Sequence, residues 1–119
     1  MIDEKRMNMQ TEYGNGALTR EEVDALEIAL VLEFGAGWCG YCQAAQPLIE
    51  EAFAGCIEPV THLKIEDGKG RRLGRSFKVK LWPTLVFIKD HVEVARVVRP
   101  GSVDALKVAL TQLHDDQVL

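Results

Sequence analysis

The sequence predicts an α/β fold, with a central mixed sheet of four strands flanked by helices and a fifth strand as the alternative. Four apolar segments, at residues 28–34, 60–65, 84–88 and 92–98, are typical of strands. Helical patterns separate the first three, which gives a β-α-β-α series. Only Lys89-Asp90-His91 separates the last two, so we expect these strands to form an antiparallel hairpin.

A capping pattern and an apolar run indicate the first helix and the first strand. Thr19 and Glu22 have the spacing of a capping box, ahead of a helix that we expect to run to about Glu27. Residues 28–34 are continuously apolar rather than alternating, which is typical of a strand buried on both faces. Glu33 is the exception within that run.

The remaining helices follow from the same periodicity. A helix is predicted from about Gly40 to Ala54, with Pro47 inside it and Gly55 at its end. Residues 68–77 are interpreted as a loop and a short helix. Ser102 is the expected cap of a last helix, whose sheet-facing side would carry Leu106, Ala109, Leu110 and Leu113.

Length and composition indicate one domain, which we place at residues 19–115 after a flexible tail at 1–18. The chain has 119 residues, and none of its apolar stretches approaches the ~18 residues of a membrane span. The polar N-terminus lacks the apolar core of a signal peptide, so we expect a cytoplasmic protein, or a periplasmic one if a leader has been removed. A net charge of −4 argues against binding to nucleic acid.

One basic segment stands out against this acidic balance. Its cations are Lys69, Arg71, Arg72, Arg75, Lys78 and Lys80. We interpret the segment as a solvated helix face, with a patch for an anion or an acidic partner as the alternative.

Cys39 and Cys42 stand directly after the first strand, at the start of a helical pattern. A thiol at a helix N-terminus lies among unpaired backbone N–H groups, which favour an anion. We therefore expect Cys39 to be the attacking thiolate and Cys42, one turn later, to resolve the mixed disulfide. The pair could also bind a metal, but a four-ligand zinc site would need a second chain, so we expect no metal.

Between Ile28 and Leu113 the chain resembles the thioredoxin family. The matching motifs are Trp38-Cys39-x-x-Cys42, Pro47 in the next helix, and Pro83-Thr84 at the head of a later strand. The resemblance implies the thioredoxin fold and thiol-disulfide exchange without an organic cofactor. It also implies disulfide-containing protein clients and an electron donor, either a thioredoxin-reductase-like flavoprotein or glutathione.

The same resemblance implies roles for residues around the two cysteines. Pro83 would be cis and shape the site, and Trp82 would offer its backbone to an extended substrate. Glu33 matches a buried acid of the family, where burial would raise its pKa and suit it as a general base for Cys42, whereas a twisted strand would turn it to solvent. The residues expected to contact a client are Trp38, Gly40, Tyr41, Trp82, Pro83 and Arg99.

Several positions depart from the usual family pattern. Tyr41 replaces a proline and gives the Cys-Gly-Tyr-Cys run familiar from bacterial disulfide isomerases. Trp82 replaces a smaller aliphatic residue and Arg99 a glycine, so we expect a narrower range of clients and a preference of Arg99 for an acidic partner. We interpret His62 as a strand histidine without a catalytic role, with tuning of Glu33 as the alternative. We interpret Cys56 as a small buried hydrophobe, with a regulatory or intermolecular thiol as the alternative.

These inferences predict a monomeric thiol-disulfide oxidoreductase that reduces a restricted set of protein clients through Cys39 and Cys42. One alternative is a disulfide isomerase or oxidase, which the redox potential of the pair would distinguish. The other is a binding adaptor with the same fold and residual redox activity.

Overall fold

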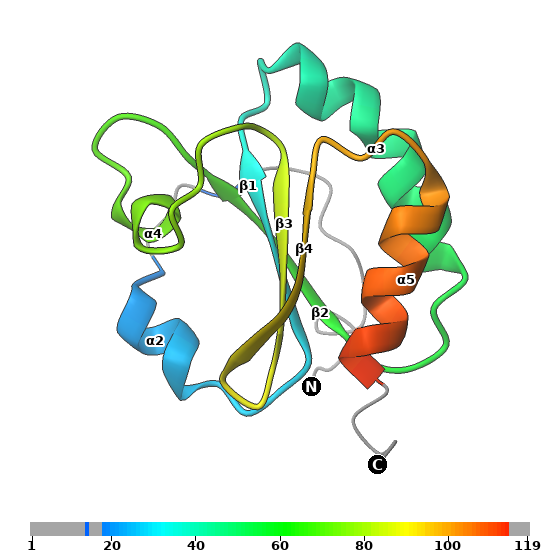
Figure 1. Ribbon diagram of the computed structural model, residues 1–119. Helices are drawn as coiled ribbons and strands as arrows, with labels where there is room; N and C mark the ends of the chain where they lie inside the picture. Colours follow the sequence, from blue (N-terminus) through cyan, green and yellow to red (C-terminus); the bar gives the residue numbers. More distant parts are fainter. Residues whose placement is uncertain (1–13, 15–17, 115–119) are drawn as a thin grey trace.

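The computed structural model in Figure 1 describes residue 14 and residues 18–114. Its elements run in the order α2 (Arg20–Ala25), β1 (Leu30–Gly35), α3 (Gly40–Ala54), β2 (Thr61–Glu66), α4 (Arg72–Ser76), β3 (Thr84–Lys89), β4 (Val92–Val98) and α5 (Val103–His114). The order of strands and helices predicted from apolar periodicity is therefore confirmed.

The strands form one four-stranded mixed sheet in the order β2-β1-β3-β4. β1 pairs in parallel with β2, which places Glu33 opposite Lys64. It pairs antiparallel with β3 on its other side, which places Phe34 opposite Thr84. β3 and β4 form the predicted antiparallel hairpin. The sheet thus has β1, and with it the start of α3, at its centre.

Helices cover both faces of this sheet, which explains why β1 does not alternate. Figure 1 shows α3 and α5 together on one side and α2 and α4 on the other. Val31 and Phe87 belong to the apolar cluster that includes α3 and α5, whereas Leu32 and Val86 belong to the cluster that includes α2 and α4. Every residue of β1 is buried, Glu33 included, so the prediction of a doubly covered strand is confirmed.

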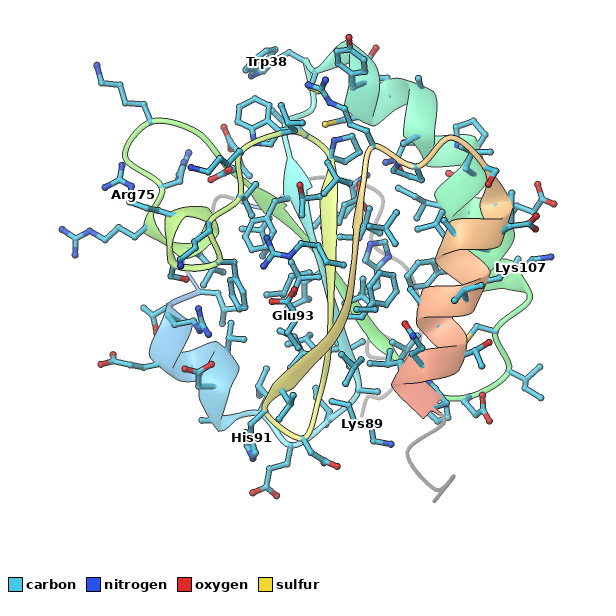
Figure 2. All side chains as sticks on the ribbon, in the orientation of Figure 1. Trp38, Arg75, Lys89, His91, Glu93 and Lys107 are labelled. Atoms are coloured by element: carbon cyan, nitrogen blue, oxygen red, sulfur yellow. The ribbon has the colours of Figure 1, made fainter. Side chains whose placement is uncertain are left out.

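Two local devices hold the elements in place. The Thr19 side chain accepts a hydrogen bond from the Glu22 backbone, and the Glu22 carboxylate accepts one from the Thr19 N–H at 2.9 Å, which completes the predicted capping box. Asp90 and His91 form the hairpin turn with φ values of 50° and 72°. A two-residue turn with both φ angles positive matches the twist of the paired strands. Figure 2 labels His91 at the tip of this hairpin.

The predicted boundary at residue 19 stays a prediction, because residues 1–13 and 15–17 of the expected tail lie outside the described residues. Gly14 forms a parallel bridge to Ile65, with its N–H donating to the Lys64 carbonyl at 2.8 Å. Leu18 packs against the cluster on the α2 and α4 side. A fifth strand is represented among the described residues by that single bridge. No helix in the described part of the chain is both long and apolar enough to cross a bilayer.

Candidate active site

Cys39 occupies the N-cap position of α3, at the point where the chain leaves the centre of the sheet. β1 ends at Gly35, and the Cys39 N–H donates to the Ala36 carbonyl at 3.2 Å in the turn that follows. The backbone of Cys39 is extended (φ −80°, ψ 121°), and its Sγ accepts a hydrogen bond from the Cys42 N–H at 3.2 Å. The sulfur therefore fills the place that a serine or aspartate oxygen takes in an ordinary N-cap.

The two cysteines differ little in exposure but greatly in position. Cys39 is 6% exposed and Cys42 is 1% exposed. Cys42 lies in the first turn of α3 and faces the interior, where it contacts a small apolar group made of Ala36, Cys39 and the Trp82 side chain. Cys39 is therefore the more accessible of the two thiols, and its role as the attacking thiolate stays a prediction.

The Trp82–Pro83 peptide bond is cis, as the resemblance predicted, and it immediately precedes β3. Trp82 packs against the apolar group around the cysteines, and its ring meets the Trp38 ring edge-on at a centroid distance of 5.5 Å. Trp38 is 74% exposed, so its indole stands largely in solvent beside the site. Figure 2 shows it at the end of the molecule where α3 begins.

Asp67 anchors the Trp82 ring, a contact that the sequence did not reveal. Its Oδ2 accepts a hydrogen bond from the indole Nε1 at 2.9 Å. Gly74 of α4 lies against the same carboxylate, so closely that a Cβ there would come within 2.2 Å of Oδ1. The Asp67 N–H in turn donates to the Gly35 carbonyl at 2.8 Å. Since the carboxyl ends of parallel strands meet at one edge, an acid just after β2 was the signal that could have placed it here.

Arg99 lies across this surface from the end of β4. Its backbone N–H donates to the Pro83 carbonyl at 2.9 Å, and its side-chain Nε donates to the Trp82 carbonyl at 2.8 Å. The guanidinium carbon lies 3.7 Å from the centre of the Tyr41 ring, in cation–π geometry. The residue thereby joins the cis-proline loop to the first turn of α3. Gly40, also predicted to contact clients, is exposed, and the space that a Cβ would take there is open to a radius of 4 Å.

Behind Cys42 lies a buried polar cluster around the Glu33 carboxylate. His62 Nε2 lies 2.8 Å from Glu33 Oε1, and Lys64 Nζ lies 3.6 Å from Oε2. Gln46 of α3 donates its Nε2 to Glu33 Oε2 at 2.9 Å and lies 3.4 Å from the Cys42 carbonyl. Phe53 stacks on the His62 ring at 4.5 Å. The cluster connects the centre of the sheet to the helix that carries the cysteines.

The side chains of Glu33 and His62 are both fully buried. The alternative of a solvent-facing Glu33 is therefore wrong. His62 contacts Glu33 directly, which is the geometry that the alternative of a tuning role requires, and its lack of a catalytic role stays a prediction. Burial disfavours an ionised carboxylate, whereas the imidazole, ammonium and amide groups around it favour one. Lys64 and Gln46 were not predicted, although the spacing of His62 and Lys64 by two residues on one strand was the available signal.

Cys56 lies just beyond the other end of α3, away from the cysteine pair. It is partly rather than fully buried, packing against the cluster that includes α3 and α5. Burial raises the pKa of the Cys56 thiol, against an opposing hydrogen bond to the Glu58 backbone. Among the described residues, no group of three or more His, Cys, Asp or Glu side chains is arranged to hold a metal ion.

Comparisons with known proteins place this site in a family. A family model described as Thioredoxin matches residues 14–112. The structure of reduced thioredoxin 2 from Pseudomonas aeruginosa is 56% identical, with a TM-score of 0.79, and the match covers 91% of this chain and 99% of that one. A thioredoxin of Chlamydia muridarum is 38% identical over 92 residues, which is 76% of this chain and 88% of that protein.

A plant relative matches over a shorter stretch. Thioredoxin H2-1 of Oryza sativa subsp. japonica is 33% identical over 69 residues, which is 58% of this chain and 49% of the relative. The match thus spans about half the length of that protein. The family model, by contrast, extends over most of the chain and includes the fold elements that position the cysteine pair, so this protein belongs to the thioredoxin family.

Proposed function

We propose that the protein is a disulfide reductase in which Cys39 and Cys42 act in sequence. The Cys39 thiolate attacks one sulfur of a client disulfide, forms a mixed disulfide and releases the other client sulfur as a thiolate. The Cys42 thiolate then attacks Cys39 Sγ, which forms the Cys39–Cys42 disulfide and releases the remaining client thiolate. The cysteine pair is oxidised, and the two electrons that it loses reduce the client disulfide.

The position of the Cys39 thiol at the head of α3 carries this proposal. Its sulfur already accepts the Cys42 N–H at 3.2 Å, a contact that strengthens when the sulfur is an anion. The positive end of the helix macrodipole acts in the same direction. Cys39 is thus held ready as the nucleophile of the first exchange step.

We assign to Glu33 the role of general base for Cys42. Gln46 contacts both the Glu33 carboxylate and the Cys42 carbonyl, so the acid is tied to the turn of helix that carries the second thiol. The carboxylate is closed off from solvent, which leaves the interior side of α3 as the route for the proton. His62 and Lys64 act as positioning residues that hold the carboxylate in this place.

The direction of the reaction depends on the compartment and the donor. We propose net reduction in a cytoplasmic setting, with a thioredoxin-reductase-like flavoprotein or glutathione returning the pair to the dithiol. The likeness to thioredoxins along most of the chain supports this direction. Disulfide-containing proteins are the proposed clients, and Trp82 and Arg99 are expected to restrict their range.

Trapping of the intermediate tests the proposed order of attack. With a disulfide-containing protein such as insulin, the Cys42→Ser variant should accumulate a mixed disulfide through Cys39, and the Cys39→Ser variant should form none. Mass spectrometry of the acid-quenched mixture reads out both species. A mixed disulfide that forms equally well in the Cys39→Ser variant would contradict the assignment of the nucleophile.

The equilibrium potential of the pair against glutathione buffers tests the direction. A value near the roughly −270 mV of thioredoxin is expected for a reductase, whereas one near the about −180 mV of protein disulfide isomerase would favour isomerisation.

A further inference from the structure

The surface over Cys39 decides which disulfides can reach it. Because Cys39 is only 6% exposed, a client must lie against the residues around its sulfur. Four side chains form this client-docking surface: Trp38, Tyr41, Trp82 and Arg99. Trp38 and Tyr41 are 74% and 60% exposed, so the surface is aromatic and open, with Arg99 as its single charged member.

Arg99 covers part of that surface in the structure. Its Nε bonds to the Trp82 carbonyl, which is a backbone acceptor beside the buried cysteines, and its guanidinium plane rests on Tyr41. A client strand that needs this carbonyl must first displace the arginine. Within the described part of the chain, no carboxylate lies within ion-pair distance of Arg99, so none of those residues neutralises its charge.

The neighbouring segment adds positive charge on the same side. Trp82 rests near Gly68, with its ring within 3.8 Å of the position that a Cβ would take there. From that glycine the chain runs into the basic segment 69–80, which contains six Lys and Arg residues and no acid. Figure 2 shows Arg75 of this segment extending outward from α4. An acidic client would therefore approach an attractive field in a protein that is acidic overall.

We propose that Arg99 is a gate that a client carboxylate opens, so that the protein selects disulfides flanked by Asp or Glu. This proposal rests on the disulfide-exchange function proposed above. A carboxylate offers the guanidinium two parallel charge-assisted hydrogen bonds, which outweigh one bond to a neutral carbonyl. A client without an acid must break the Arg99–Trp82 contact and offers the guanidinium no partner of its own, so that water alone replaces the lost bond.

Two matched peptides test this selection. Each carries one disulfide to a neutral 2-thiopyridine group, and they differ only in having Glu or Gln beside the cysteine. We expect the reduced wild-type protein to cleave the Glu peptide with a second-order rate constant roughly tenfold higher, which corresponds to about 1.4 kcal/mol. We also expect 0.5 M NaCl to shrink this ratio.

Three variants separate the parts of the proposal. Arg99→Gly removes both cover and charge, so the ratio should fall to about one, with the Gln peptide cleaved several-fold faster than by the wild type. Its backbone tolerates this change, because the φ of 48° at this position is one that glycine adopts freely. Arg99→Gln keeps an N–H donor at the same distance along the side chain but loses the charge. The Arg99→Gln variant should cleave the Glu and Gln peptides at similar rates, and both rates should stay near the low rate of the wild type with the Gln peptide.

Arg96→Gln is the matched control, because it removes one arginine from β4, the strand that ends just before Arg99. The Arg96 side chain bonds to Glu93 and not to the docking surface. This variant should keep the wild-type ratio. The gate proposal would be overturned if Arg99→Gly left the Glu-to-Gln rate ratio unchanged. It would also be overturned if Arg96→Gln lowered that ratio as much as Arg99→Gly does. If the wild type cleaves neither peptide, the exchange function itself fails, whereas equal cleavage of both peptides by the wild type defeats the gate alone.

Discussion

The two sides of the cysteine pair are built on opposite principles. Behind Cys42, the side chains of Glu33, His62 and Lys64 are at most 2% exposed, and the latter two both contact the Glu33 carboxylate. In front of Cys39, the docking surface is open, and its members meet through ring contacts and one hydrogen bond to a backbone carbonyl. One cysteine pair therefore lies between a buried polar cluster and an exposed surface whose contacts a client can displace.

Because the inner cluster is buried, we expect substitutions there to destabilise the protein strongly. A charge taken out of water must be compensated by partners nearby, and removal of one partner leaves the others uncompensated. On the outer side, solvent can replace a lost contact, so each contact contributes less. The inner cluster is thus expected to govern stability and proton transfer, and the outer surface to govern which client is accepted.

The largest expected effect comes from breaking the inner cluster. Glu33→Gln should lower the free energy of unfolding by about 3–5 kcal/mol, because the buried Lys64 loses the carboxylate that compensates its charge. Urea denaturation at fixed pH measures this. Lys64→Met alone should also destabilise, and the double variant should cost less than the sum of the two. Additive effects within about 0.5 kcal/mol would contradict a coupled cluster.

A smaller effect is expected where the outer surface meets the body of the protein. Gly74→Ala would place a methyl group 2.2 Å from Asp67 Oδ1, so that carboxylate must move away from the Trp82 indole. We expect a loss of about 1–3 kcal/mol in stability and a changed tryptophan fluorescence.

Gly101→Ala provides the control for this substitution, because no atom lies within 4 Å of its Cβ position. It should change stability by less than about 0.5 kcal/mol and leave the fluorescence as it is. If Gly74→Ala behaves like this control, the Asp67 carboxylate does not support Trp82.

The smallest effect is expected for the cysteine that belongs to neither side. Because burial raises the pKa of Cys56, the thiolate fraction near pH 7.5 is lower than in a free cysteine. Alkylation of Cys56 should therefore be several-fold slower than that of a small thiol and should accelerate as the pH rises above about 8.5.

The rates are measured with iodoacetamide in a Cys39→Ser/Cys42→Ser background, with the urea-unfolded chain as the reference. Cys56→Ala in the otherwise unchanged protein should leave disulfide reduction as it is. Labelling as fast in the folded as in the unfolded chain would show that the thiol is not protected.

Much of the fold could be predicted because its signals are local. The capping pair at Thr19, the continuous run of β1 and the short hairpin connection each depend on residues close together in the chain. The position of Cys39 at a helix N-terminus belongs to the same class. Glu33 stood out as a charge inside an apolar strand, and the resemblance to thioredoxins implied that it is buried.

The partners of these residues were harder to predict. His62 lies 29 positions from Glu33 in the chain, and its contact with Glu33 was only the second of two interpretations. Asp67 and Gln46 were not singled out at all, since a lone acid after a strand or a glutamine in a helix has many ordinary explanations. The register of β1 against β2 and the packing of α3 on the sheet bring these groups together, and neither is a property of a local pattern.

The sequence by itself thus determined the order of the elements, the cysteine pair at the head of a helix and the likeness to thioredoxins, because periodicity, capping and motif spacing act over a few residues. The contacts among the groups around that pair depend instead on how the whole fold packs. The Arg99 contact with Trp82 spans 17 positions, and the cluster behind Cys42 joins two strands and a helix. Long-range packing sets such contacts, because a side chain's electrostatic surroundings depend on distance in space rather than along the chain.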